Sequence, residues 1–270
     1  MRLVSLMFRR PTCHEGRFRA KTQKDTMQRR RFIKAVTLAG LALSKPAFAF
    51  GRAGQLTFAL LDAGEASARH KAWTRLGLEV EARTSIAVAS KALIIDADAP
   101  ELFDYPLVIC CGQGAVPEWP EQRWKRLAHY VRSGGMLYFD SLVPGDGFGE
   151  RCLARLARQL PADAVGQTTK DHVLFRSFYL LERPVGRSVA EGQTERLELD
   201  GRMVALAADV DLAGALLRDE FGAWSFPCDP GGEDQREYAI RFGVNMIMYA
   251  LCTDYKADQV HIPFLLKRRQ

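Results

Sequence analysis

Cysteine and histidine, the residue types that most often bind zinc, are both scarce in this sequence. The 270 residues include six cysteines and five histidines. Short spacings between such residues mark structural metal sites, and none of the cysteine pairs here has one. The chain therefore has neither the ligand set of a zinc module nor the cysteine density of a disulfide-stapled scaffold. We expect no metal ion and no cofactor.

The sequence predicts that each cysteine after residue 49 is either a small core residue or a candidate for a disulfide. Cys110 and Cys111 are adjacent in an apolar run. Because neighbours on a strand point to opposite faces, this pattern predicts two small core residues with unreactive thiols. Cys228 with Cys252, or either of them with Cys152, could form a disulfide after export. The sequence does not choose between these pairings, and at least one thiol stays unpaired.

Long apolar runs are also missing. The run Ala35–Leu43 has nine residues, whereas a helix needs about 20 to cross a ~30 Å hydrocarbon core. A charged segment precedes this run, and small residues ending in Ala47-Phe48-Ala49 follow it. This tripartite order is that of a cleavable signal peptide, so we expect no integral membrane protein after cleavage.

The charged segment reads Gln28-Arg29-Arg30-Arg31-Phe32-Ile33-Lys34. Its arginine pair, followed by one residue and then Phe-Ile-Lys, resembles the twin-arginine export signal. Gln28 stands where that family more often has Ser or Thr. Met27 stands two residues before the arginine pair, so we expect translation to start there. Residues 27–49 are then the signal peptide, and residues 1–26 are a non-native extension. The resemblance implies a periplasmic protein. The residues that carry the signal are Arg29, Arg30, Phe32, Lys34, Ala47 and Ala49.

The excess of positive charge belongs to this leader. The whole chain has a formal net charge of +6, but residues 1–49 hold 12 Lys or Arg and two acids, Glu15 and Asp25. Residues 50–270 carry 26 basic and 30 acidic side chains. A basic surface that attracts nucleic acid is therefore not expected on the mature protein.

The first half of the mature chain alternates short apolar runs with amphipathic segments. Such runs, joined by helices through short turns, predict parallel strands connected by right-handed crossovers. We therefore expect an α/β fold with a doubly wound, mostly parallel sheet of the flavodoxin-like type. The expected strands are 56–61, 92–96, 107–112 and 136–140, and the expected helices are 68–83, 119–132 and 150–160.

The second half is less regular. Two apolar runs, 196–199 and 203–207, flank Asp200-Gly201, a dipeptide that favours a tight hairpin turn. A long helix is expected over 233–252, with Phe242, Met246 and Tyr249 on one buried stripe and Asn245 bonded to backbone groups near a strand end. Neither a repeat nor a low-complexity linker divides the chain, so residues 50–270 are expected to form one domain.

Two segments carry a family resemblance. Residues 130–137 with Asp140, one helix after the strand 107–112, resemble the class I glutamine amidotransferase-like fold. The run 241–251, the segment 255–261 and the motif Arg183-Pro184-Val185-Gly186-Arg187 resemble the bacterial domain-of-unknown-function family 4159 (DUF4159). The resemblance covers residues 54–266 and implies a fold without implying a reaction.

The nucleophile of the amidotransferases is missing at its expected place. These enzymes carry a cysteine on a Gly-x-Cys-x-Gly elbow directly after a strand. Here Asp140 and Ser141 follow the corresponding strand, and no glycine precedes Ser141 as an elbow requires. The sequence therefore predicts a domain without amidotransferase chemistry.

A polar site remains possible where open α/β sheets usually bind ligands, at the carboxyl ends of the strands. Asp62, Gln113 and Asp140 follow three successive expected strands and could converge there, although such residues are more often helix caps or turn residues. His172 lies near in sequence to a segment in which Arg183 and Arg187 bracket Pro184 and Gly186, and paired guanidinium groups suit a carboxylate or phosphate. The candidate cleft comprises Asp62, Gln113, Asp140, Ser141, His172, Arg183 and Arg187.

Two functions are compatible with these features. The first is an exported, non-catalytic, amidotransferase-like domain that binds a ligand or a protein partner in the cell envelope. The alternative is a hydrolase or transferase that uses a carboxylate site around Asp140 and Asp62. An enzyme of that kind requires the two carboxylates within reach of each other in a pocket, with shifted pKa values.

Overall fold

A seven-stranded sheet runs through the computed structural model, which describes residues 55–63, 66–189 and 194–267. The order of the strands is β2-β1-β3-β4-β7-β6-β5. The first five strands in this order are parallel to one another. Their order matches the flavodoxin-like order 2-1-3-4-5, with β7 as the fifth strand. Beyond β7, β6 pairs antiparallel with β7, and β5 pairs antiparallel with β6. The expected α/β, doubly wound, mostly parallel sheet of flavodoxin-like order is confirmed. The strands are β1 (Ala59–Leu61), β2 (Leu93–Ile95), β3 (Leu107–Gly112), β4 (Met136–Ser141), β5 (Val165–Thr168), β6 (Thr194–Leu199) and β7 (Arg202–Ala208).

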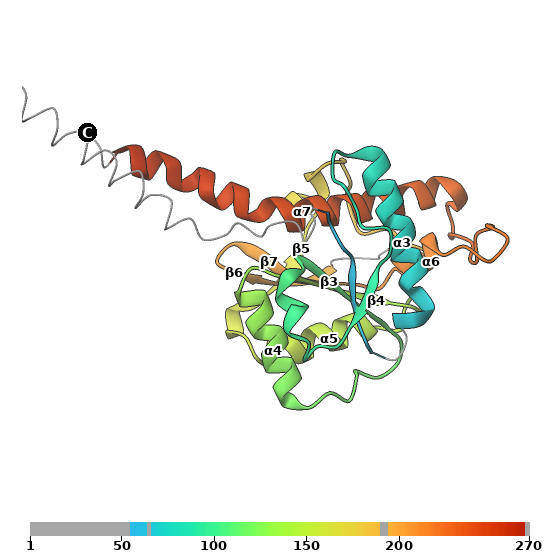
Figure 1. Ribbon diagram of the computed structural model, residues 1–270, viewed down its shortest axis with the longest axis horizontal. Coiled ribbons are helices and arrows are strands. Elements are labelled where there is room, and N and C mark those ends of the chain that lie inside the picture. The colour runs from blue at the N-terminus through green and yellow to red at the C-terminus, as the bar shows by residue number, and fades with distance from the viewer. Residues whose placement is uncertain (1–54, 64–65, 190–193, 268–270) are drawn as a thin grey trace, which may run out of the picture. The chain divides into compact units, whose positions relative to one another are not determined.

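Helices cover both faces of this sheet (Figure 1). One layer consists of α3, α6 and α7, and the other consists of α4 and α5. Because both faces are covered, β3 and β4 are buried at every position, which explains the apolar runs Leu107–Gly112 and 136–139. The helices are α3 (Ala66–Arg83), α4 (Glu121–Arg132), α5 (Phe148–Ala157), α6 (Leu212–Leu216) and α7 (Gly232–Lys267), with short 3₁₀ turns η1 (Pro100–Asp104), η2 (Ala162–Ala164) and η3 (Val173–Arg176).

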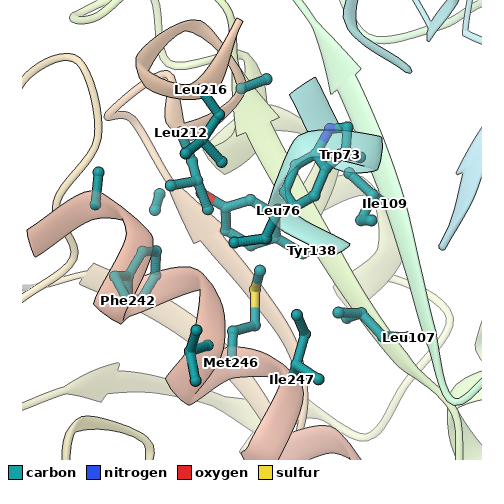
Figure 2. Packing of buried hydrophobic residues seen from close by; sticks show 14 of the residues in the cluster. Trp73, Leu76, Leu107, Ile109, Tyr138, Leu212, Leu216, Phe242, Met246 and Ile247 are labelled. Carbon is teal, nitrogen blue, oxygen red and sulfur yellow. The ribbon is translucent and has the colours of Figure 1, made fainter. Parts of the chain in front are cut away.

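The core under α3 and α7 is built around aromatic side chains. The Tyr138 ring from β4 makes edge contacts with Trp73 of α3 and Phe242 of α7, at centroid distances of 5.9 and 6.2 Å. Figure 2 shows these three side chains converging with Leu76 and Met246. The predicted burial of Phe242, Met246 and Tyr249 is therefore confirmed.

Asn245 lies in the same helix and is fully buried. Its Oδ1 accepts hydrogen bonds from the backbone N–H groups of Phe178 and Tyr179, at 3.2 and 2.6 Å, and its Nδ2 donates to the Tyr179 carbonyl at 2.8 Å. The expected backbone partners are thus present. They belong to the loop after η3 and not to a strand end, because α7 crosses that loop.

The hairpin between β6 and β7 forms at the predicted dipeptide. Asp200 and Gly201 have φ angles of 51° and 74°, the left-handed conformations that a tight two-residue hairpin turn requires. The sequence patterns did not predict β5 or α6, and α7 continues 15 residues beyond the expected end at Cys252. The element β5 pairs only at the sheet edge, where burial imposes no clear alternation on its sequence.

The cysteines of the described residues are all free thiols. Cys110, Cys111, Cys152 and Cys228 are buried, and Cys252 is half-buried, so the disulfide pairings left open by the sequence are not formed. Within the described ranges, no helix combines the length and the apolar character needed to cross a membrane. The extension 1–26 and the signal residues 27–49 lie outside the described residues.

Candidate functional site

The carboxyl ends of β1, β3, β4 and β7 meet at one edge of the sheet because these strands are parallel. The predicted cleft residues occupy this edge at different depths. Asp62 and Gln113 are exposed, whereas Asp140 and Ser141 are buried. In flavodoxin-like sheets the switch point lies between the first and third strands, which here corresponds to the position of Asp62 and Gln113.

Asp140 is tied to the start of α6. Its Oδ1 accepts a hydrogen bond from the Leu212 N–H at 2.9 Å, and its Oδ2 accepts one from the Ala213 N–H at 2.8 Å. The Tyr138 hydroxyl also donates to Oδ1 at 3.2 Å. These two amides belong to the first turn of a helix and have no partner within it. Asp140 therefore fastens α6 to the end of β4.

Asp211 completes this arrangement from the end of β7. Its backbone has a φ angle of 48°, and its Oδ1 accepts a hydrogen bond from the Gly214 N–H at 2.7 Å. A Cβ atom at Gly214 would collide with the Asp211 carboxylate, so this approach requires glycine. Asp140 and Asp211 together satisfy three successive amides of α6.

Both carboxyl groups have pKa values above the usual range for aspartate. Burial, followed by the charge of Asp211, raises the pKa of Asp140 to about 7. Burial is also the main cause of the raised pKa of Asp211, while the charge of Arg69 and the hydrogen bonds from Gly214 and Arg187 act in the opposite direction. The carboxylate whose charge raises the pKa of Asp140 is thus that of Asp211, and not that of Asp62 as the sequence suggested.

The other groups near the strand ends that resemble nucleophiles serve the packing. The Ser141 hydroxyl accepts a hydrogen bond from the Gly149 N–H at 3.0 Å, on the α5 side of the sheet. The Cys111 thiol accepts one from Trp73 Nε1 at 3.3 Å. Burial and the charge of Asp140 raise the pKa of Cys111, which keeps it in the thiol form.

Two guanidinium groups lie around Asp211. Arg187 Nε donates to Asp211 Oδ2 at 2.6 Å, and an Arg69 nitrogen lies 3.9 Å from the same oxygen. The guanidinium carbons of Arg69 and Arg187 lie 4.9 and 5.1 Å from the centroid of the Phe226 ring. Side chains from α3, from the segment 185–189 and from the loop before α7 therefore meet at this point.

The backbone positions Arg187 by a close contact between two segments. The Arg187 N–H donates to the Asp211 carbonyl at 3.1 Å, and the Ser188 N–H donates to the Val210 carbonyl at 3.0 Å. A Cβ atom at Gly186 would collide with the backbone of Val210, so only glycine permits this approach. Gln235 Nε2 also donates to the Arg187 carbonyl at 2.9 Å, which ties the segment to α7.

The remaining predicted residues lie elsewhere. Arg183 is exposed, so the cationic partner beside Arg187 is Arg69 and not Arg183. His172 is half-buried, accepts a hydrogen bond from the Leu174 N–H on its Nδ1, and stacks against Tyr249 at a centroid distance of 5.6 Å. Burial lowers its pKa, so it is neutral at pH 7. It caps η3.

Sequence reasoning missed Arg69, Asp211 and Phe226. A weak signal for Asp211 existed, because Asp209 and Asp211 both come shortly after the strand 203–207, near the edge where Asp140 ends its own strand. Arg69 lies near the start of the helix after the first strand, a place that the same rule for strand ends indicates. Phe226 carries no comparable signal, since its position depends on the fold of the loop before α7.

The described part of the chain offers no group of three or more His, Cys, Asp or Glu side chains suited to a metal ion. The donors near the strand ends are instead arginines, which suit anions.

Residues 56–251 match the model of a family described as "Domain of unknown function (DUF4159)". The chain belongs to the DUF4159 family.

This match agrees with the resemblance carried by residues 183–187 and 241–251. The range that matches DUF4159 includes the whole group of residues at the carboxyl edge, from Asp62 to Phe226. No curated protein matches the chain.

Proposed function

We propose that this DUF4159 protein is exported through the twin-arginine pathway to the periplasm and that its amidotransferase-like domain binds a ligand or an envelope partner without catalysing a reaction. The observation that carries the proposal is the placement of Asp140. Both of its carboxylate oxygens are occupied by the α6 amides, and its side chain is fully buried. A group used in this way supports the fold and does not reach a substrate.

The thiols support the same proposal. A cysteine nucleophile must be accessible and must reach the thiolate form. Cys110 and Cys111 are fully buried, and their pKa values are raised, for Cys110 chiefly by its hydrogen bond with Cys152 and for Cys111 by burial. Ser141 faces α5, on the opposite side of the sheet from Asp140.

The alternative, a carboxylate enzyme, takes its support from the raised pKa of Asp140, since shifted carboxyl groups are common in active sites. Asp140 would have to leave the α6 amides to act on a substrate. Two backbone hydrogen bonds and one from Tyr138 oppose that movement. The binding function therefore has the stronger physical support.

The test is native mass spectrometry of the protein recovered from the periplasm after expression with its own signal. We expect a bound small molecule or a bound partner protein that is released when the protein is denatured. The same sample is assayed for hydrolase and transferase turnover. Turnover that Asp140→Asn abolishes in a folded protein would reject the proposal in favour of the carboxylate enzyme.

A further inference from the structure

Arg69 and Arg187 come from segments that are far apart in the sequence, yet both guanidinium groups lie near the Phe226 ring and near Asp211 Oδ2. Both guanidinium groups lie within 5.1 Å of the Phe226 centroid and within 3.9 Å of Asp211 Oδ2. Like charges in such proximity repel each other, and of the carboxyl groups around them only Asp211 forms an ion pair with either arginine, because both oxygens of Asp140 accept from the α6 amides. A second anion would remove the remaining repulsion.

The hydrogen-bond donors of the Arg69 and Arg187 guanidinium groups are only partly satisfied. Each guanidinium group has five N–H donors. For Arg187 the acceptors are Asp211 Oδ2 at 2.6 Å and the Leu142 carbonyl at 3.4 Å. The Arg69 ion pair with Asp211, at 3.9 Å, is too long for a hydrogen bond. The Nε atom of Arg69 is buried and has no hydrogen-bond partner among the described residues.

A buried donor without an acceptor is rare in folded proteins and calls for a missing partner. A purely structural ion pair would bring Arg69 into contact with the Asp211 carboxylate, as Arg187 is. Instead Arg69 Nε has no acceptor among the described residues, while 26% of the Arg187 side chain and 12% of the Arg69 side chain are exposed to solvent. A small molecule can therefore approach from the side of Arg187.

We propose that Arg69 and Arg187 form a binding site for the oxyanion group, carboxylate or phosphate, of a small ligand, with the Phe226 ring packed against both guanidinium groups. This inference rests on the proposed binding function and specifies the chemical class of its ligand. Arginine suits the role because its planar fork of donors matches the oxygens of a carboxylate or phosphate. Asp211 orients Arg187 and competes with the ligand for both arginines.

The test is isothermal titration calorimetry on the full processed chain, with inorganic phosphate and with succinate as separate probes at constant ionic strength. We expect saturable binding of at least one probe. Arg69→Gln should weaken it about tenfold or more, because a hydrogen-bonded charge pair is lost. Preference for one probe decides between phosphate and carboxylate as the natural group.

Three further variants separate a binding role from a structural one. Arg187→Gln removes the second guanidinium group and should weaken binding about tenfold, as Arg69→Gln does. Arg183→Gln and the exposed Arg176→Gln should leave the affinity unchanged. Circular dichroism verifies the fold of each variant.

The proposal is overturned if the folded protein binds neither probe saturably, or if folded Arg69→Gln and Arg187→Gln bind as tightly as the wild type. An uncharged ligand found in the periplasmic sample would also reject this oxyanion site while leaving the binding function intact. Turnover dependent on Asp140 would instead reject the binding function itself. The two failures are therefore distinguishable.

Discussion

Asp140 and Asp211 divide the first three amides of α6 between them, although Asp140 lies at the end of β4 and Asp211 lies in the turn after β7. Asp140 accepts from Leu212 and Ala213, and Asp211 accepts from Gly214. A helix of five residues has almost no internal hydrogen bonds of its own. These two carboxylates therefore hold α6 in place at the carboxyl edge of the sheet.

Asp140→Asn should destabilise the protein. Either oxygen of the Asp140 carboxyl group can accept an N–H, whereas the NH2 group of asparagine cannot, so one buried N–H of α6 loses its partner, at a cost of about 1–3 kcal/mol. Urea unfolding at pH 5 measures the loss. Asp104→Asn, at the exposed end of η1, is the control and should be neutral. Equal stability of Asp140→Asn and wild type would show that the α6 contacts are dispensable.

The stability of the wild type should also depend on pH through Asp140. Its folded pKa of about 7 exceeds the ordinary value of 3.8, so between these values the native state holds a proton that the unfolded state has released. This contribution to stability is complete below pH 3.8 and is lost as the pH rises through 7, by at most about 1.4 kcal/mol per unit. The stability gap between wild type and Asp140→Asn should therefore shrink from pH 5 to pH 8. A constant gap would contradict the raised pKa.

Phe242→Ala should cost about 2–5 kcal/mol, the usual range for removing a large buried side chain. The ring is fully buried and packs edge-on against Tyr138. Tyr238→Ala, one turn earlier on the same helix, removes an aromatic ring that is 47% exposed and should cost far less. Thermal unfolding compares the two. Similar melting temperatures for both variants would mean that α7 is not the element that closes this core.

The buried thiols should resist chemical modification. Cys110 and Cys111 are fully buried with raised pKa values, whereas Cys252 is half-buried. A maleimide reagent at pH 7.5 should therefore label Cys252 first and leave the pair in β3 unlabelled until the protein unfolds. Peptide mass spectrometry identifies the labelled sites. Rapid labelling of Cys111 in the folded protein would indicate a nucleophile.

Export should depend on the arginine pair. We expect the double variant Arg29→Lys, Arg30→Lys to keep the precursor in the cytoplasm, since lysine does not reproduce paired guanidinium groups. Arg31→Lys, the adjacent arginine outside the pair, serves as the matched control and should be exported. Fractionation followed by immunoblotting measures the periplasmic yield. An unchanged yield from the double variant would exclude the twin-arginine route.

The amino-acid sequence by itself determined the central elements of this protein. Apolar runs such as Leu107–Gly112 are long enough to indicate strands covered on both faces, and Asp200-Gly201 supplies the left-handed turn of a hairpin locally. The stripe of Phe242 and Met246 likewise follows from helical periodicity. Each of these features depends on residues that lie close together in the chain, so the local sequence pattern is enough to predict it.

Only the tertiary structure decided which side chains meet at the strand ends. Arg69 reaches Arg187 across 118 positions of the chain, and the contact between Gly186 and Val210 that aligns them leaves no periodic trace in the sequence. The sequence likewise placed Asp140 with the exposed Asp62, whereas burial beneath α6 pairs it with Asp211. Burial and long-range backbone contacts set the environment of a charged group, and both exist only once the sheet and its two helical layers have assembled.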